Sequence, residues 1–404
     1  MKIAVVVPNY PPTICGVGDY TYHKIQEFLK AGIEVHVICS ADQKPEPAAQ
    51  PLIYPMIKVW NVMGFKAVLD KLDAIKPDWV IVEYVPHGFE PHGLPIAVLG
   101  FYKGLTHRKY NILTVFHEVR VRPGNKLSSR FISAVETYLA RKIVQYSTKV
   151  VTSIDFYADL LRGGNKNLRK IGNLPKINAN ASKINVIPIG TGIMPIETNA
   201  TISESFKKRF NIPSNAPVIV TFGNRNVTEY LAAFDKLNQD ILDFIWLLCG
   251  KTSTPMDVLE SRPYLRNTGK MSAKDIYYAL SLGDIAFLPE PVNAQLEGGS
   301  SNKSTALACV FSLGVPIVGI KGDMNNVLLK DNDNILLANL NESGSLYKAL
   351  KNALNTEGSS DVGFGLSDLG RNAYATYQNA LSWEVIGQQF LGLMDVQAYQ
   401  VSNT

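Results

Sequence analysis

The sequence predicts an α/β protein built from two doubly wound parallel-sheet domains that face each other across a cleft. Short apolar runs alternate with amphipathic helical segments, which is the pattern of parallel strands covered by helices. The alternation occurs in two blocks, separated at residues 189–216 by a segment rich in Pro, Gly, Thr, Asn and Ser. A length of 404 residues suits two domains of ordinary size.

The first block opens with a continuous apolar strand, a glycine-containing loop, a helix that starts at Asp19 and stops at Gly32, and a second strand. The expected strands are 2–8, 33–39, 79–85, 112–116, 149–153 and 184–187. Further helices are expected over 62–75, 94–105, 127–146 and 155–161. Residues 162–182 are rich in Asn, Lys and Gly, show little periodicity and are predicted to form an exposed loop.

The second block repeats the pattern after the linker. Strands are expected over 218–222, 244–248, 285–288 and 315–320. Helices are expected over 227–237, 272–282, 306–313, 345–354 and 366–396. In such folds ligands bind at the carboxyl ends of the strands. The loops that follow five of these strands should therefore converge in the cleft, and they carry Gly16, His117, Arg225, Lys251 and Glu297.

The most informative stretch runs from residue 295 to 319, QLEGGSSNKSTALACVFSLGVPIVG. It places a carboxylate, Glu297, and two glycines before a polar run and an apolar helix. Free N–H groups at a helix start attract anions, and a lysine there adds a full charge. We therefore predict a phosphate-binding loop, with these donor-binding candidates: Gly298, Gly299, Ser300, Ser301, Asn302, Lys303, Ser304 and Thr305. The alternative is an ordinary polar loop with Ser304 as the helix N-cap.

A Walker A loop does not fit this stretch. That motif needs a glycine directly before the lysine and another glycine five positions before that one. Asn302 and Glu297 stand near those places instead. His87 and His92 lie within PHGFEPHG, but no cysteine or third histidine is close in sequence, so we predict no metal site.

Composition and charge narrow the class of partner. The four cysteines have no metal-ligand spacing, and Cys39, Cys249 and Cys309 are predicted to be buried thiols, which suits a reducing cytoplasm. The start of the chain is predicted to be a strand, not a signal peptide, and no apolar run is long enough to span a membrane.

The net charge is +5, yet residues 101–190 carry 16 Lys and Arg against 4 Asp and Glu. This basic half suggests an anionic membrane face, lipid phosphate or glycan, the alternative being a solvated face without a partner. No nucleic-acid-binding motif accompanies the charge.

Several segments in order resemble the GT-B glycosyltransferases, most closely the retaining family 4. These are PPTICGVGDY at the first loop, VTSIDFYADL with VIPIGTGI, VTFGNRN, LRNTGKMSAKDIYYALSLGDIAFLP, LGVPIVG and LSWEVIGQQFLGLM. The resemblance covers nearly the whole chain. It implies two Rossmann-like domains: 1–195 would bind the acceptor and 196–380 the nucleotide sugar, with a helix over about 380–404 packing back on the first.

The resemblance implies a retaining transfer of a sugar from a nucleotide-diphosphate sugar to an acceptor hydroxyl, in surface polysaccharide or glycolipid synthesis. His117 and Glu297 would act at the donor sugar, and Glu118, adjacent to His117, would contact the acceptor, a glycan or lipid-linked molecule. His87 is predicted from its loop to contact the acceptor too. Gly16, Arg225 and Lys303, with Lys251 as a further cation, would bind the diphosphate without a metal or other cofactor. The protein would work in the cytoplasm, on the inner membrane face.

Three other functions stay open. Thr305 stands where the family has a second glutamate that holds the ribose, so a non-catalytic sugar-nucleotide-binding subunit is one alternative. A phosphorylase or an epimerase on the same fold is another. A nicotinamide-dependent dehydrogenase is disfavoured, because CGVGDY lacks the third glycine of the dinucleotide fingerprint and Ile38-Cys39-Ser40 provides no acidic residue after the second strand.

Overall fold

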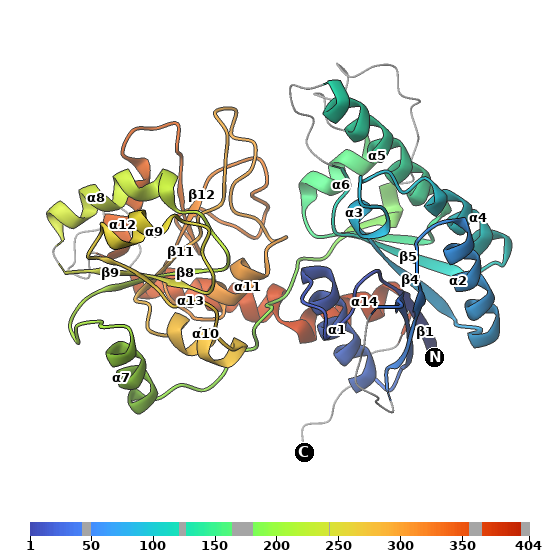
Figure 1. The fold of residues 1–404 in the computed structure, drawn as a ribbon, viewed down its shortest axis with the longest axis horizontal. Coiled ribbons are helices and arrows are strands. Elements are labelled where there is room, and N and C mark those ends of the chain that lie inside the picture. The colour runs from blue at the N-terminus through green and yellow to red at the C-terminus, as the bar shows by residue number, and fades with distance from the viewer. Residues whose placement is uncertain (43–49, 121–126, 164–180, 242, 355–365, 397–404) are drawn as a thin grey trace. The chain divides into compact units, whose positions relative to one another are not determined.

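The computed structural model describes residues 1–42, 50–120, 127–163, 181–241, 243–354 and 366–396. The chain divides into two compact units (Figure 1). Unit one contains Met1–Pro188 together with the segment from Trp383 onward, and unit two contains Ile189–Ser382. The chain thus passes between the units at Pro188 and again at Ser382, compared with the boundaries of 195 and about 380 expected from the sequence.

Unit one is built on a seven-stranded, wholly parallel sheet with the order β3-β2-β1-β4-β5-β6-β7. The strands are β1 (Lys2–Val6), β2 (Glu34–Ser40), β3 (Leu52–Ile57), β4 (Trp79–Tyr84), β5 (Asn111–Phe116), β6 (Lys149–Thr152) and β7 (Ile184–Val186). The inner strands β1 and β4 are apolar along nearly their whole length and buried on both faces, as parallel strands between two helical layers must be. Glu83 on β4 is the exception.

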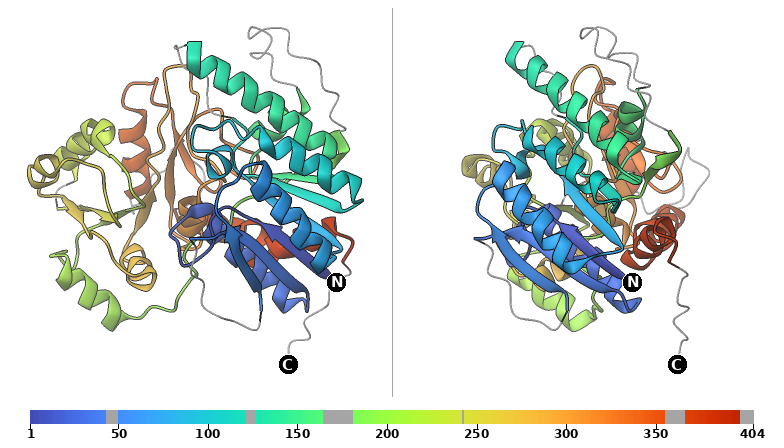
Figure 2. Two further views of the ribbon diagram at one scale, coloured as in Figure 1. Left: turned by 45° about the vertical axis from the view of Figure 1, so that its right-hand side comes forward. Right: turned by 90° about the vertical axis from the view of Figure 1, so that its right-hand side faces the viewer.

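The helices of unit one are α1 (Gly16–Lys30), α2 (Val62–Ile75), α3 (Pro86–Phe89), α4 (Ala97–His107), α5 (Leu127–Tyr146), α6 (Asp155–Arg162), a 3-10 turn η2 (Ala181–Lys183) and the C-terminal α14 (Trp383–Leu393). The C-terminal helix packs directly on α1 (Figure 1; Figure 2). The approach is close because α14 has glycine at the contact, and a Cβ on Gly387 would lie 2.5 Å from the Cβ of Glu27. Trp383 and Phe390 add aromatic contacts to α1.

Unit two contains a six-stranded parallel sheet with the order β10-β9-β8-β11-β12-β13. Its strands are β8 (Val218–Phe222), β9 (Ile245–Cys249), β10 (Leu265–Asn267), β11 (Ile285–Phe287), β12 (Ile317–Ile320) and β13 (Leu336–Ala338). Its helices are α7 (Ala200–Arg209), η3 (Thr228–Tyr230), α8 (Leu231–Asp240), α9 (Met256–Glu260), α10 (Ala273–Leu280), α11 (Thr305–Phe311), α12 (Ser345–Leu354) and α13 (Leu366–Thr376), followed by a π-helical turn η4 (Tyr377–Leu381).

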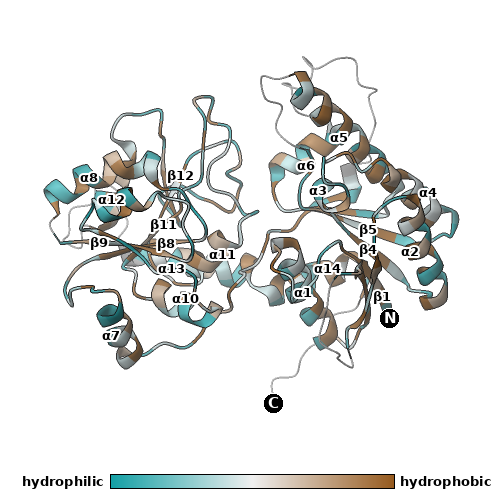
Figure 3. Cartoon of the chain, viewed as in Figure 1, coloured by the Kyte–Doolittle hydropathy of each residue, from teal (hydrophilic) through white to brown (hydrophobic). Residues whose placement is uncertain are grey.

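Successive residues of a strand point to opposite faces of this sheet, and each face has its own hydrophobic core. Val218 and Val220 belong to one core, and Ile219 between them belongs to the other. The covering helices are amphipathic, which is visible for α8 and α12 as two colours on one helix (Figure 3). In α12 the buried side chains Leu346, Leu350 and Ala353 recur at helical spacing and face the sheet.

Several elements differ from the sequence prediction. The presumed linker contains the helix α7, because Phe206 supplies one buried anchor to an otherwise polar segment. The edge strand β3 was not predicted, since Pro55 interrupts its pattern, and edge strands tolerate proline. The short elements α3, α9, β10 and β13 were also missed, and most of the predicted loop 162–182 lies outside the described residues.

Other expectations are confirmed. The helices α2, α5 and α12 and the strand β8 have the predicted bounds. Cys39, Cys249 and Cys309 are buried free thiols. Among the described helices, none combines the length and the apolar character needed to cross a membrane.

Candidate functional site

The predicted residues of unit two gather at the switch point of its sheet. From β8 the chain adds β9 and β10 on one side of the sheet. It then returns to the other side of β8 and adds β11, β12 and β13 there. The loops that follow β8 and β11 lie at the carboxyl edge of the sheet beside this point, and open α/β sheets bind ligands at such a place. Arg225 follows β8, Lys251 follows β9, and the loop 288–304 follows β11.

An ion pair joins the loops on either side of this switch point. Arg225 donates two hydrogen bonds to Glu290, with Nη1 to Oε2 at 3.1 Å and Nη2 to Oε1 at 2.6 Å. Both side chains are largely buried, at 25% and 16% exposure. The Arg225 carbonyl in turn accepts hydrogen bonds from the Thr252 hydroxyl at 2.6 Å and the Ser253 N–H at 3.1 Å. The neighbouring Lys251 is exposed.

Glu290 is the centre of a small charged cluster. Burial raises the pKa of its carboxyl above the usual value, although the charges of Arg225 and Lys303 and a hydrogen bond from Ser304 act in the opposite direction. Ser304 occupies the N-cap position of α11 but makes no capping hydrogen bond. Sequence reasoning missed Glu290, whose signal is an acidic residue two positions after an apolar strand, in AFLPEP.

The glycine pair has a structural role within the loop. Gly298 and Gly299 have φ values of +121° and +83°, which strongly favour glycine. A Cβ on Gly298 would lie 2.2 Å from the Pro291 carbonyl oxygen. Their N–H groups donate to Asp323 at 2.9 Å and to Pro291 at 3.1 Å. The Ser300 N–H donates to the Ile320 carbonyl at 2.9 Å.

These three N–H groups of the predicted phosphate-binding loop are therefore engaged within the protein, and phosphate binding by the loop stays a prediction. The groups donate within unit two, because the loop folds against the strand β12 and the turn after it. In this conformation the cluster's positive charge comes from side chains, with Arg225 and Lys303 both acting on Glu290.

The other predicted residues of the loop lie at different depths. Glu297 is exposed, and Asn293 donates to its carboxylate at 2.9 Å. Ser300, Ser301 and Asn302 are buried. The Asn302 amide nitrogen and oxygen have no hydrogen-bond partner among the described residues. Thr305 is the first residue of α11. Its side chain lies against Gly192, so that a Cβ added to Gly192 would be 3.3 Å from the Cβ of Thr305.

Unit one places His117 directly after β5, as the sequence predicted, and buries it. Its Nε2 lies 2.8 Å from Oε2 of Glu83 on β4, and its main-chain N–H donates to the Tyr84 carbonyl at 3.0 Å. Glu118 follows and is partly buried. Sequence reasoning did not identify Glu83, although an acidic residue inside the apolar run WVIVEYV is a usable signal.

Gly16 and His87 are the remaining candidates of unit one. Gly16 is the first residue of α1, and a Cβ there would meet nothing within 4 Å, so no described neighbour requires a glycine. His87 is exposed on α3, and its imidazole lies against Gly93.

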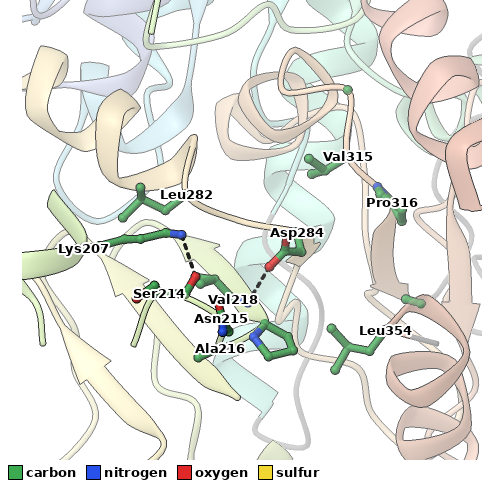
Figure 4. A pocket seen from close by; sticks show the side chains of 13 residues that line it. Lys207, Ser214, Asn215, Ala216, Val218, Leu282, Asp284, Val315, Pro316 and Leu354 are labelled. Carbon is green, nitrogen blue, oxygen red and sulfur yellow. Dashed lines mark hydrogen bonds between the residues drawn. The ribbon is translucent and has the colours of Figure 1, made fainter. Parts of the chain in front are cut away.

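A cavity of about 460 Å³ lies in unit two, away from these residues. Its lining includes Lys207, Val218, Asp284, Pro316 and Leu354, at the amino ends of the strands (Figure 4). Two hydrogen bonds cross the lining, from Lys207 to the Ser214 carbonyl at 3.0 Å and from the Val218 N–H to Asp284 at 2.8 Å. None of the predicted site residues lines this cavity.

Comparison with solved structures supports the fold. A glycosyltransferase from Rickettsia africae is similar over 97% of both chains, with 14% identity and a TM-score of 0.65. HepE from Anabaena in complex with UDP is similar over 98% of this chain and 100% of that one, with 13% identity and a TM-score of 0.64. The UDP-GlcNAc 2-epimerase from Neisseria meningitidis bound to UDP-GlcNAc is similar over 98% and 99%, with 13% identity and a TM-score of 0.52.

No family model matches the sequence. No curated protein matches it either. The structural similarities, with the two parallel sheets, show that the chain has the GT-B fold.

Proposed function

We propose that this protein is a glycosyltransferase that moves a sugar from a nucleotide-diphosphate sugar to an acceptor hydroxyl with retention of the anomeric configuration. The observation that carries the proposal is the charged cluster of Arg225, Lys303 and Glu290 at the switch point of unit two. Open α/β sheets bind ligands at such a point, and HepE, which shares the fold, was solved with UDP; both support the proposal.

The charged cluster suits the leaving group of this reaction. Negative charge develops on the nucleotide diphosphate as the bond to the sugar breaks, and preorganised cations lower the barrier most when water is excluded. Arg225 and Lys303 provide that charge, so in this proposal the transfer needs no metal. Ser304 and the buried amide of Asn302 supply further polar groups.

The remaining candidates receive roles from the family resemblance. Glu297 binds the hydroxyls of the donor sugar and stabilises its developing positive charge. His117 hydrogen-bonds the donor sugar, and Glu118 beside it contacts the acceptor. Gly16 lies at the start of α1 with open space around it, which leaves room for a ligand near the backbone.

The first experiment is a thermal-shift screen of nucleotide diphosphates and nucleotide sugars, with uridine compounds first. A ligand at 100 times its dissociation constant should stabilise the protein by about 2.7 kcal/mol. The nucleotide sugar that gives a shift is then tested for transfer to glycan and lipid-linked acceptors, with magnesium or with a chelator. NMR of the product gives the anomeric configuration. No shift with any nucleotide sugar would reject the donor site, and an inverted product would reject retention.

An epimerase is the second candidate, because the Neisseria meningitidis epimerase shares the fold over nearly the whole chain. The same NMR samples without acceptor separate the two functions. An epimerase converts the nucleotide sugar into its epimer without an acceptor, whereas a transferase leaves it intact or slowly hydrolyses it. A donor-induced shift with neither transfer nor epimerisation favours a non-catalytic binding subunit.

The proposal includes binding to an anionic membrane surface, where a lipid-linked acceptor would lie. The protein would then work in the cytoplasm, on the inner membrane face. The helix α5 exposes Leu127 and Phe131 at 82% and 65%, within a region that carries a local excess of 12 positive charges over residues 101–190. Exposed apolar residues beside basic ones favour insertion between anionic headgroups. Co-sedimentation with phosphatidylglycerol vesicles should exceed that with phosphatidylcholine vesicles and weaken in Phe131→Ser. Equal binding to both vesicle types would reject this part.

A further inference from the structure

Glu83 is a buried carboxylate that no part of the proposed reaction uses. It lies on β4, next to β1 at the switch point of the unit-one sheet, and its side chain has 0% exposure. A buried charge without partners is strongly unfavourable, so such a residue needs both a counter-charge and hydrogen bonds. The structure provides both.

The counter-charge is Lys24 on α1, which is also fully buried. Its ammonium donates to Oε1 of Glu83. The same ammonium lies 4.7 Å from the ring centre of Phe390 on α14 and 5.1 Å from that of Tyr20. Lys24 therefore occupies one oxygen of Glu83 and leaves the other for a second donor.

That second donor is the imidazole of His117, whose Nε2 lies 2.8 Å from Oε2 of Glu83. Burial raises the pKa of Glu83, but the charge of Lys24 and the hydrogen bond from His117 outweigh this effect and hold the pKa below its usual value. An ionised carboxylate only accepts hydrogen bonds, so Nε2 must carry the proton. Tyr20 packs edge-on against the imidazole at 4.9 Å and limits its rotation.

We propose that Glu83 is a positioning residue, which fixes His117 as the Nε2–H tautomer and presents Nδ1 as an acceptor for a substrate hydroxyl. In a neutral imidazole with hydrogen on Nε2, Nδ1 keeps its lone pair. No hydrogen bond to Nδ1 is found from any described residue. The substrate part of this inference rests on the proposed function, whereas the tautomer does not.

The test uses two double variants of the full chain, in which Lys24→Met removes the counter-charge together with the carboxylate. Lys24→Met/Glu83→Leu removes the acceptor at Nε2, and Lys24→Met/Glu83→Gln keeps an acceptor oxygen at that place. Replacing a buried ion pair with apolar groups of similar size commonly preserves stability. Thermal unfolding of both variants checks that they fold.

The first readout is the tautomer of His117 from long-range proton–nitrogen correlation spectra near pH 8, assigned with His117→Gln. Wild type should show the proton on Nε2, the leucine variant a mixture of both tautomers, and the glutamine variant a population closer to wild type. A proton on Nδ1 in wild type, or an unchanged tautomer in the leucine variant, would overturn the inference.

The second readout is steady-state transfer with the donor found in the screen. The leucine variant should lose about tenfold to 100-fold in kcat/KM, the loss seen when the hydrogen-bond partner of a metal-ligating histidine is removed, and the glutamine variant should recover part of it. An unchanged kcat/KM in a folded leucine variant would overturn the substrate part. If wild type transfers no sugar, the proposed function fails, while the tautomer spectra still decide whether Glu83 positions His117.

Discussion

Arg225 and Glu290 are joined by two hydrogen bonds, with the shorter at 2.6 Å, and connect the loops after the neighbouring strands β8 and β11. The guanidinium predicted to bind phosphate is thus already engaged by a carboxylate. A diphosphate that binds at this switch point must share Arg225 with Glu290 or displace it. Lys303 acts on the same carboxylate, so the charge of Glu290 affects both cations.

Arg225→Ala should weaken binding of the donor about tenfold to 100-fold, because hydrogen bonds to charged groups contribute about 1.5–3 kcal/mol. Isothermal titration calorimetry with the nucleotide sugar found in the screen measures the change. Lys207→Ala is the matched control, since it removes one positive charge from the same unit at the opposite strand ends. Equal affinity of Arg225→Ala and wild type would exclude Arg225 from the donor site.

The affinity for the donor should rise as the pH falls. Burial raises the pKa of Glu290, so this carboxyl takes up its proton at a higher pH than an ordinary glutamate does. The neutral carboxyl no longer compensates Arg225 and Lys303, whose charge then acts on the diphosphate. Calorimetry from about pH 8 down to about pH 5 should show this trend, with a nucleotide sugar because its diphosphate does not titrate there.

The variant Glu290→Gln separates this effect from other titrating groups. It should bind the donor more tightly than wild type at neutral pH and lose the pH trend, since the glutamine amide carries no charge. If Glu290→Gln instead binds more weakly at neutral pH, the carboxylate serves mainly to orient Arg225, and the expected competition is absent.

The glycines of the two predicted binding loops should differ in their effect on stability. Gly298→Ala should destabilise the fold by about 2 kcal/mol or more, because φ is +121° and the new Cβ would meet the Pro291 carbonyl oxygen at 2.2 Å. Gly16→Ala should leave the unfolding temperature nearly unchanged, since its Cβ meets nothing within 4 Å. Thermal unfolding measures both, and a similar loss in Gly16→Ala would contradict the open space at that position.

The same two variants also bear on ligand binding. Gly16→Ala should fold normally, and a weaker affinity for the donor in calorimetry would place Gly16 beside the ligand. Unchanged affinity would remove Gly16 from the donor site.

Docking of the C-terminal helix depends on one glycine. Gly387→Ala should destabilise the protein by about 1–3 kcal/mol, because its Cβ would lie 2.5 Å from the Glu27 Cβ and force α14 away from α1. Gly392→Ala in the same helix meets nothing within 4 Å and should be neutral or stabilising by up to about 1 kcal/mol. Denaturant unfolding compares the two variants. Equal stability would show that the contact between α14 and α1 is looser than the structure indicates.

The sequence located several site residues but not the residues they pair with. His117 and Arg225 were identified because each follows an apolar strand, and that position is encoded locally. Glu83 and Glu290 were missed. Glu83 sits inside an apolar strand, and Glu290 lies in a proline-flanked loop. Their importance depends on partners 34 and 65 residues away along the chain.

The loop that was most informative in the sequence shows the same limit. Its order of carboxylate, glycines, polar run and helix predicted a helix from residue 306, and α11 begins one residue earlier, at Thr305. The use of its N–H groups was not predictable, because Gly298 and Ser300 donate to Asp323 and Ile320, which lie 20 or more residues further along.

The sequence by itself determined the fold class, the approximate positions of the longer elements and the order of two α/β blocks, because hydrophobic periodicity and glycine or proline stops act over a few neighbouring residues. The tertiary structure decided which side chains meet. Strand order brings β4 beside β5 and β8 beside β11, and this placement pairs Glu83 with His117 and Glu290 with Arg225. Such pairs form only when the sheet does, because the free energy that holds them comes from burial and charge compensation between distant segments.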